Sequence, residues 1–303
     1  MPLTHEVDDS RLGAHGESRG RHHDLVHQRV HQWLQADSEP PGWTAQQQAT
    51  WPASASTLIA GDRGALLVDA LLTTTEGERL AGWVKSWGKN LSTIYITHGH
   101  GDHFFGAGPS LDAFPQAQLV TLPEVVDDAR EQQSPEALAT WNSWFKGQFD
   151  EKSATPTALI SDEPEIDGHV VRFIGLGGSD GVDNTVVRVP ELSTVVSGDV
   201  VYNNLHMWLW NSTPESRAEW LATLDALAAL RPEKIITGRR DPDAPNDDAQ
   251  RVLAQSRRYI EDFDTAVTRS GSVVQLVDAT TQRYSAYGNP YGLLAAAATR
   301  FES

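Results

Sequence analysis

Three histidines and an aspartate fall within six residues of the stretch "ITHGHGDHFFG", which covers residues 96–106. His98 and His100, with one glycine between them, can direct two imidazoles at a single point. Asp102 and His103 follow on the same turn and can serve a neighbouring point. Because the chain has only 11 histidines in 303 residues, such a cluster is improbable by chance. The spacing therefore predicts a metal site.

The composition limits both the ligands and the partners of this site. Cysteine is absent, so any metal must be held by histidine nitrogens and carboxylate oxygens. The formal charge of −17, from 24 Lys and Arg against 41 Asp and Glu, predicts a surface that repels nucleic acid and anionic membranes. We therefore expect a small-molecule substrate, with neither nucleic acid nor a membrane as partner.

The chain shows no pattern of export or membrane insertion. Its first residues are polar and lack the apolar segment of a signal peptide. The longest late apolar run, "GLLAAAA", is too short to cross a bilayer. We therefore expect a cytoplasmic protein.

The histidine loop follows the run "LSTIYIT", which predicts a buried strand with His98 at its carboxyl end. Before it, the β-like runs "STLIAG" and "GALLVDA" are separated by "DRG", a hairpin pattern. Helical patterns alternate with further β runs as far as "EKIITG". Strands grouped between helices predict an α/β fold in which a sandwich of sheets is covered by helices.

We expect one main domain with additions at both ends. Residues 1–55 are predicted to form an N-terminal leader and helix, and residues 56–245 the main domain. Residues 246–303 are predicted to form a helical C-terminal extension of that domain. In the leader, "DLVHQRVHQWLQ" has apolar residues at 25, 26, 30, 33 and 34, the pattern of an amphipathic helix.

Over roughly residues 56–245 the sequence resembles the metallo-β-lactamase-fold superfamily, and within it the glyoxalase-II-like hydrolases. The family signature His-x-His-x-Asp-His is complete in the loop described above. The bridging aspartate of the family corresponds to Asp199 in "VVSGDVVYN". The resemblance implies an αββα sandwich of two mixed sheets flanked by helices, a site at one edge of the two sheets, and metal-assisted hydrolysis.

Two family histidines are missing, so the metal site is degenerate. Gly178 stands where the third histidine belongs, and Arg239 stands in place of the last one. The first metal keeps His98, His100 and Asp199, and the second keeps Asp102, His103 and Asp199. We expect one divalent metal, zinc, iron or manganese, or none.

Other side chains are candidates for completing the site. A guanidinium at Arg239 that faces Asp102 or Asp199 can replace part of the charge of the second metal. Asp180 and Asp183, in the loop that lost its histidine, offer a carboxylate ligand or cap the loop. His206 is a candidate proton shuttle or substitute ligand, or else an ordinary surface histidine.

Three functions are consistent with these residues. The first is hydrolysis of a small ester, lactone or amide, with Asp102 as general base where no second metal holds it. The second is non-hydrolytic: oxygenation by one iron, or a metal-free lyase, cyclase or isomerase reaction in which histidine is the base and Arg239 holds an anionic group. The third is a catalytically silent, ligand-binding member of the family. Trp208 and Trp210 line a substrate pocket or make core or dimer contacts, and the C-terminal helices are a candidate homodimer interface.

Overall fold

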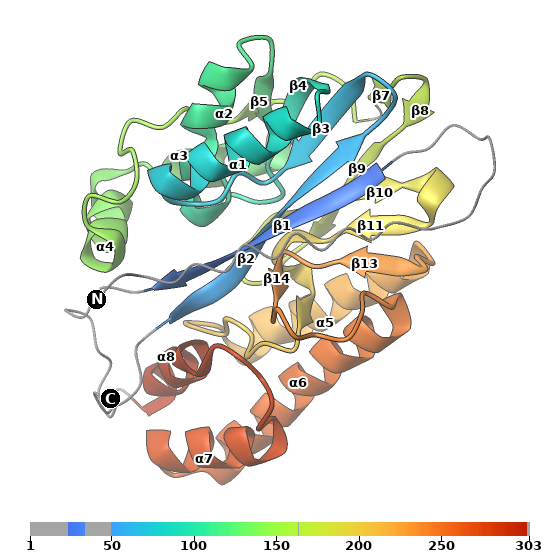
Figure 1. The fold of residues 1–303 in the computed structure, drawn as a ribbon. Coiled ribbons are helices and arrows are strands. Elements are labelled where there is room, and N and C mark those ends of the chain that lie inside the picture. The colour runs from blue at the N-terminus through green and yellow to red at the C-terminus, as the bar shows by residue number, and fades with distance from the viewer. Residues whose placement is uncertain (1–23, 34–49, 163, 302–303) are drawn as a thin grey trace.

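The computed structural model describes residues 24–33, 50–162 and 164–301 (Figure 1). Two β-sheets lie face to face, and helices cover the outer surface of each sheet, as Figure 1 shows. This four-layer arrangement confirms the α/β sandwich expected from the sequence. Within the described residues, no helix is both long and apolar enough to cross a membrane.

The larger sheet has the order β12-β14-β2-β3-β4-β5-β6. An eighth strand, β1, pairs with β2 along the edge opposite β3. β2 and β3 form the antiparallel hairpin predicted from "DRG", whereas β3, β4 and β5 run parallel. Its strands are β1 (Asp24–Trp33), β2 (Thr50–Ala60), β3 (Gly64–Val68), β4 (Asn90–Tyr95), β5 (Gln118–Thr121), β6 (Thr157–Ala158), β12 (Tyr202–Asn203) and β14 (Arg239–Arg240).

The second sheet has the order β13-β11-β10-β9, with β11 and β13 parallel and the other pairs antiparallel. Its strands are β9 (Arg172–Gly177), β10 (Asn184–Val189), β11 (Thr194–Val196) and β13 (Lys234–Ile236). A separate two-stranded sheet consists of β7 (Glu165–Ile166) and β8 (His169–Val170).

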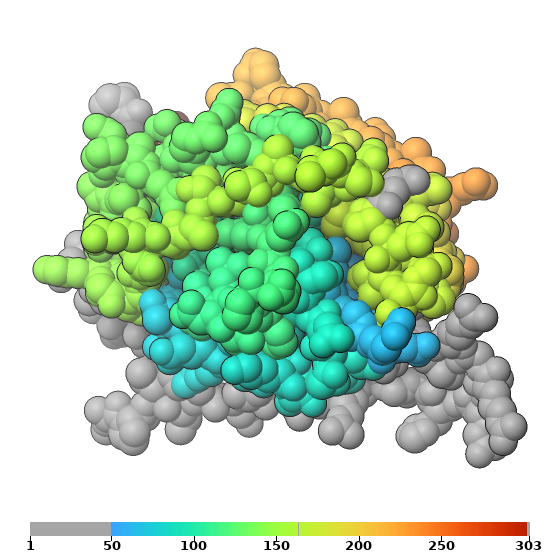
Figure 2. Space-filling view, turned by 90° about the horizontal axis from the view of Figure 1, so that it is seen from above, coloured from blue at the N-terminus to red at the C-terminus, as the bar shows by residue number. Residues whose placement is uncertain are grey.

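The helices fall into two layers. The first four cover the larger sheet and form the face seen from above in Figure 2. Of the last four, the first two pack against the second sheet, the third packs on its neighbouring helices, and the last packs against β2. They are α1 (Thr74–Ser86), α2 (Gly108–Ala113), α3 (Val126–Glu131), α4 (Pro135–Phe145), α5 (Pro214–Ala229), α6 (Ala249–Arg269), α7 (Val273–Arg283) and α8 (Pro290–Phe301).

Three apolar cores separate the four layers. Between the sheets, Tyr95 of β4 stacks on Phe173 of β9, with ring centroids 3.8 Å apart and planes 9° from parallel. The Tyr95 hydroxyl also lies 2.7 Å from the hydroxyl of Thr185 on β10. These contacts lock the two sheets together close to the end of β4, where the histidine loop begins.

The helix predicted near residues 25–34 is wrong, because Asp24–Trp33 forms strand β1. Its backbone pairs antiparallel with β2 along nearly its full length, and that pairing decides the conformation. Val26 and Val30 lie four residues apart, a spacing that fits one face of a helix and one face of a strand equally well. The leader residues 1–23 and 34–49 lie outside the described part of the chain.

Candidate metal centre

The candidate site forms where four strands end. Asp69 follows β3, the histidine loop follows β4, Asp199 follows β11, and Arg239 follows β13 after two residues. β3 and β4 are parallel, as are β11 and β13, so each pair delivers its carboxyl ends to one edge of its sheet. Residues distant in sequence therefore meet at one edge of the sandwich.

Two glycines allow these strand ends to approach each other. Gly198 has φ +51°, and a Cβ there would lie 2.5 Å from the hydroxyl oxygen of Thr97. A Cβ on Gly238 would lie 2.7 Å from the backbone of Gly198. Any larger residue would push the strand ends apart. The glycines thus place the next residues, Asp199 and Arg239, side by side.

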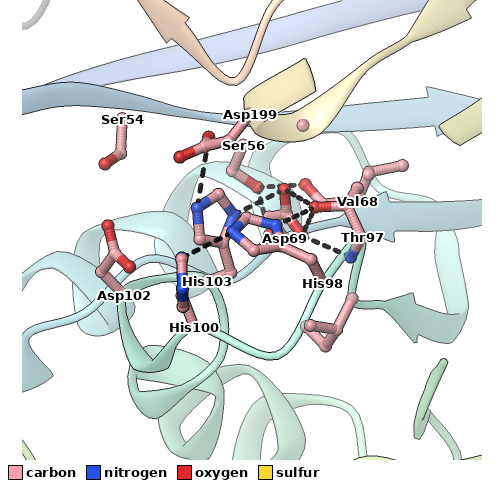
Figure 3. A network of polar contacts seen from close by, with 12 residues as sticks. Ser54, Ser56, Val68, Asp69, Thr97, His98, His100, Asp102, His103 and Asp199 are labelled. Carbon is pink, nitrogen blue, oxygen red and sulfur yellow. Dashed lines mark hydrogen bonds and ion pairs between the residues drawn. The ribbon is translucent and has the colours of Figure 1, made fainter. Parts of the chain in front are cut away.

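One group of metal-ligand atoms consists of His98, His100 and Asp180. Nε2 of His98 lies 3.1 Å from Nδ1 of His100 (Figure 3), and the latter atom lies 3.5 Å from Oδ2 of Asp180. Two ligand atoms about 2.1 Å from one metal lie roughly 3 to 3.5 Å apart. These two distances fit ligands of a single ion, and all three donor atoms lie within 4.8 Å of one another.

The path of the loop around Gly178 explains why Asp180 joins His98 and His100 in this group of ligand atoms. A Cβ at Gly178 would lie 2.9 Å from Cδ of Glu219, so Glu219 of α5 fills the space that a side chain at 178 would need. Two residues later Asp180 turns inward, its side chain only 2% exposed, and its Oδ1 accepts a hydrogen bond from the Ser179 hydroxyl at 3.0 Å. Asp180 thus supplies a carboxylate to the loop that lacks the histidine.

Thr97 fixes the tautomer of His98. Its hydroxyl lies within hydrogen-bond distance of both oxygens of Asp69, at 3.1 and 3.0 Å, and 3.1 Å from Nδ1 of His98 (Figure 3). Because a hydroxyl has one proton and the carboxylate can only accept it, Thr97 must accept from Nδ1–H of His98. Nε2 then presents its lone pair to the group with His100, as a metal ligand requires.

A second group joins His98, His103 and Asp199. Nδ1 of His103 lies 2.9 Å from Asp69, and its Nε2 lies 3.3 Å from Oδ1 of Asp199 (Figure 3). Within the described residues, this buried Oδ1 accepts no hydrogen bond. Although it is ion-paired with His103, this oxygen lies within 4.8 Å of a ligand nitrogen of His98 and can contribute to a metal.

The guanidinium of Arg239 occupies the position between Asp102, His103 and Asp199. Its side chain is 3% exposed, and each of its nitrogens has a partner in the protein. Nε donates to Asp199 Oδ2 at 2.7 Å. Nη1 donates to the carbonyl of Pro52 at 3.2 Å and to the hydroxyl of Ser54. Nη2 donates to Asp102 Oδ2 and lies 3.1 Å from Nε2 of His103.

The charges of the site follow from burial and these contacts. Burial, and then the neighbouring His103, lower the pKa of His98 to about 3. Burial opposes charge on His100 and His103, but Asp180 raises the pKa of His100 to about 9, and Asp69 and Asp199 raise that of His103. Burial favours the neutral forms of Asp102 and Asp199, but Arg239 lowers both carboxyl pKa values well below their usual range.

A cavity of about 360 Å³ opens beside these groups. His100, Asp102, Asp180 and Arg239 are among the residues that line it. The rest of its wall includes five tryptophans: Trp51, Trp141, Trp144, Trp208 and Trp210. Trp208 and Trp210 thus line a pocket, one of the alternatives that the sequence left open.

The structure brings together six of the seven site residues expected from the sequence, His206 being the exception. His206 is buried against Tyr259, with Nδ1 2.9 Å from the tyrosine hydroxyl, and burial lowers its pKa to about 4. It does not line the cavity next to His100.

Sequence reasoning missed Asp69 and Trp51. Asp69 ends the strand that lies beside β4, and its position directly after the run "GALLV" is the signal that would have indicated it. Trp51 lay in the segment assigned to the leader. Its indole N–H donates to Oδ2 of Asp102 at 2.8 Å, so β2 joins the site to the cavity wall.

Comparisons with known proteins agree with this architecture. Residues 49–239 match the family model of the metallo-β-lactamase superfamily. That match covers more than half of the chain, which therefore belongs to this superfamily. No curated protein matches the sequence.

Several solved structures share the fold. A metallo-β-lactamase from Pontibacter korlensis has a TM-score of 0.56 at 17% identity, covering 86% of this chain and 100% of that one. A metallo-β-lactamase family protein from Thermus thermophilus has a TM-score of 0.57 at 19% identity, covering 80% and 87%. The FIM-1 metallo-β-lactamase from Pseudomonas aeruginosa, solved in a mono-zinc form, has a TM-score of 0.54 at 15% identity, covering 78% and 91%.

The donor set fits one metal ion and not two. His98, His100 and Asp180 converge with the spacing of ligands, and Asp199 has an oxygen without a hydrogen-bond donor beside them. In the place of a second ion, the positive guanidinium of Arg239 already bonds the carboxylates that would have to bind it. A second cation there would repel the first.

Proposed function

We propose that this protein is a hydrolase that uses a single divalent metal to cleave a small ester, lactone or amide. The observation that supports this most is that a three-donor group and a buried arginine lie side by side next to the cavity. His98, His100 and Asp180 form a three-donor group there, and Arg239 takes the place of a second metal. A metal held by those donors supplies Lewis acidity at neutral pH.

In ester hydrolysis the water oxygen bonds to the carbonyl carbon, and the bond from that carbon to the leaving oxygen breaks. One proton of the water passes to the leaving alcohol, so the products are an acid and an alcohol. The chain contributes the polar side chains of Asp180 and His100, which line the cavity, and a set of indole rings beside them that can pack on a substrate.

Asp102 is better suited to positioning than to proton transfer. Its Oδ2 accepts hydrogen bonds from both Trp51 and Arg239. Because Arg239 keeps the pKa of this carboxyl well below its usual range, against the effect of burial, Asp102 is a poor base. We assign to Asp102 the role of fixing the guanidinium and the indole beside the metal group.

The proposal is tested with protein loaded in turn with zinc, manganese and iron, assayed on benzyl acetate, δ-valerolactone and 4-nitroacetanilide. A His98→Ala/His100→Ala variant is the control for metal-independent cleavage. We expect at least one substrate to be hydrolysed, with a rate lowered by about 100-fold or more in the variant. Equal rates in the two proteins, or no turnover of any substrate by metal-loaded protein, would contradict the proposal.

A second candidate, a mononuclear iron oxygenase, is favoured by one observation. Two histidines and one carboxylate, here His98, His100 and Asp180, form the ligand type of non-haem iron(II) oxygenases. Iron bound in preference to zinc, together with oxygen uptake that requires an added organic substrate, would support it. Preference for zinc and no oxygen uptake would reject it.

The metal-free alternative has less support. It requires Arg239 to hold an anionic group, but every nitrogen of that guanidinium already has a partner within the protein. No described contact specifically favours a silent, ligand-binding role over catalysis.

A further inference from the structure

Two unlike sets of side chains line the cavity beside the metal group. One set consists of His100, Asp102, Asp180 and Arg239. The other is a group of five indole rings, half of the ten tryptophans in the chain, and Gln132, Thr140 and Asn211 add uncharged polar lining. We call the five rings, Trp51, Trp141, Trp144, Trp208 and Trp210, the tryptophan wall. The ring centroid of Trp51 lies 5.5 Å from that of Trp141, 5.3 Å from that of Trp144 and 4.9 Å from that of Trp208. The centroid of Trp210 lies 5.9 Å from that of Trp144 and 6.1 Å from that of Trp208.

Three separate segments build this wall: strand β2, helix α4 and the loop after β12. Two of its rings have their N–H groups satisfied inside the protein. Trp51 donates to Asp102 at 2.8 Å, and Trp141 donates to Gln132 at 3.0 Å. These rings can therefore offer their apolar faces to a ligand without leaving a polar atom unpaired.

The outermost ring of the wall is left at the surface. Trp210 is 39% exposed, and its neighbours Trp144 and Trp208 are only partly buried. Removing a large indole from water is favourable, so a cluster of partly exposed tryptophans beside a cavity is a surface that gains from being covered.

The charges of the cavity select against an anionic ligand. Among the described residues that line it, Arg239 is the only Lys or Arg, and each of its nitrogens already bonds to the protein. The other basic side chain, His100, faces Asp180 at 3.5 Å. An added carboxylate or phosphate would meet the acidic side chains of Asp102 and Asp180, and the chain itself has no unpaired cation among the described lining residues to bind it.

The geometry points to a substrate with an uncharged aromatic group that stacks on the tryptophan wall while its carbonyl reaches the metal-ligand group of His98, His100 and Asp180. Tilted and edge-to-face ring contacts, already present among these indoles, are the arrangement in which a further flat ring packs well. The cavity volume of about 360 Å³ is within the range of small-molecule sites. This inference rests on the proposed hydrolase function for the carbonyl end, but the aromatic site is testable by binding alone.

The first test is isothermal titration of the full-length protein with three acetamides. N-benzylacetamide carries an uncharged ring, N-ethylacetamide lacks the ring, and 4-(acetamidomethyl)benzoate adds a negative charge to it. We expect N-benzylacetamide to bind about tenfold more tightly than each of the others. Equal affinity for the ethyl compound would overturn the aromatic site, and equal or tighter binding of the benzoate would overturn the preference for an uncharged ligand.

The second test replaces rings of the wall and one ring outside it. Trp210→Ala and Trp144→Ala should each weaken N-benzylacetamide binding by about tenfold, and Trp210→Phe should restore most of the loss. Trp87→Ala, which removes a partly buried ring at the end of α1, should leave binding within about twofold of the wild type. Unchanged affinity in folded Trp210→Ala protein would overturn the assignment.

Turnover separates this inference from the proposed function. Benzyl acetate and ethyl acetate share an acyl group and have similar leaving alcohols. A kcat/KM about ten or more times higher for benzyl acetate, with the preference lost in Trp210→Ala, would support both the aromatic site and the hydrolase function. Selective binding of N-benzylacetamide without ester hydrolysis would keep the aromatic site and reject the hydrolase. Hydrolysis without any preference for the benzyl ester would keep the hydrolase and reject the aromatic site.

Discussion

Nε of Arg239 donates to Oδ2 of Asp199 over 2.7 Å, and both side chains are almost fully buried. The resemblance to the superfamily assigns to Asp199 the role of bridging two metal ions. Here one side of that carboxylate is held by a cation of the chain itself, while Oδ1 has no hydrogen-bond donor among the described residues. The same guanidinium bonds Asp102. We therefore propose that Arg239 replaces one of the two ions.

Removing the guanidinium should be costly when metal is absent. Arg239→Met leaves Asp102 and Asp199 buried without their partner, and we expect the free energy of unfolding to fall by about 3–5 kcal/mol. Urea denaturation in the presence of a chelator measures this change. Arg130→Met, which removes a pair whose side chains are 65% and 90% exposed, should cost less than about 1 kcal/mol. Similar losses in the two variants would contradict the account of Arg239.

Replacing the cation by a neutral ligand should change the metal stoichiometry. In Arg239→His an imidazole joins Asp102, His103 and Asp199, so we expect bound metal to rise from about one to about two equivalents per chain. Arg239→Lys keeps a positive charge at this position and should remain near one equivalent. Elemental analysis after dialysis distinguishes the two outcomes, and a second metal in Arg239→Lys would show that charge does not exclude it.

Asp180 is expected to be a metal ligand because it lies with His98 and His100. Asp180→Asn preserves size but removes the charge, and metal affinity should fall about tenfold or more. Competition with a chromogenic chelator measures this affinity. Asp183→Asn, in the same loop but outside both ligand groups, should bind metal like the wild type. Equal affinity in all three proteins would remove Asp180 from the site.

Thr97 is expected to act through the tautomer of His98. Thr97→Val removes the hydroxyl that accepts from Nδ1–H, so the ring loses its orientation and metal affinity should fall by about 10–100-fold. Thr121→Val also removes a buried hydroxyl, one that donates to the carbonyl of Ile96 at 2.7 Å, but it should leave metal affinity unchanged. If metal affinity fell in both variants in proportion to their loss of folding stability, the role of Thr97 would be merely structural.

The part of the site that is local in sequence was predictable, and the part that depends on packing was not. His98, His100, Asp102 and His103 share one loop at the end of a strand whose apolar run is evident. Asp69 joins them only because β3 pairs with β4 in parallel.

The inward turn of Asp180 depends on the path of a loop, which no spacing rule gives. Gly178 leaves room for Glu219, and Asp180 then reaches His100. The strand at Asp24–Trp33 was mistaken for a helix because a short apolar pattern fits both periods until its partner strand is known. The cytoplasmic location and the homodimer stay predictions.

Metal content tests the central claim most directly. Full-length protein is expressed with zinc, iron and manganese supplied together, dialysed, and analysed by elemental mass spectrometry against its measured concentration. The account predicts about one equivalent of bound metal per chain, held by His98, His100 and Asp180. Two equivalents would show that Arg239 does not replace the second ion, and no bound metal would contradict the metal-dependent hydrolase.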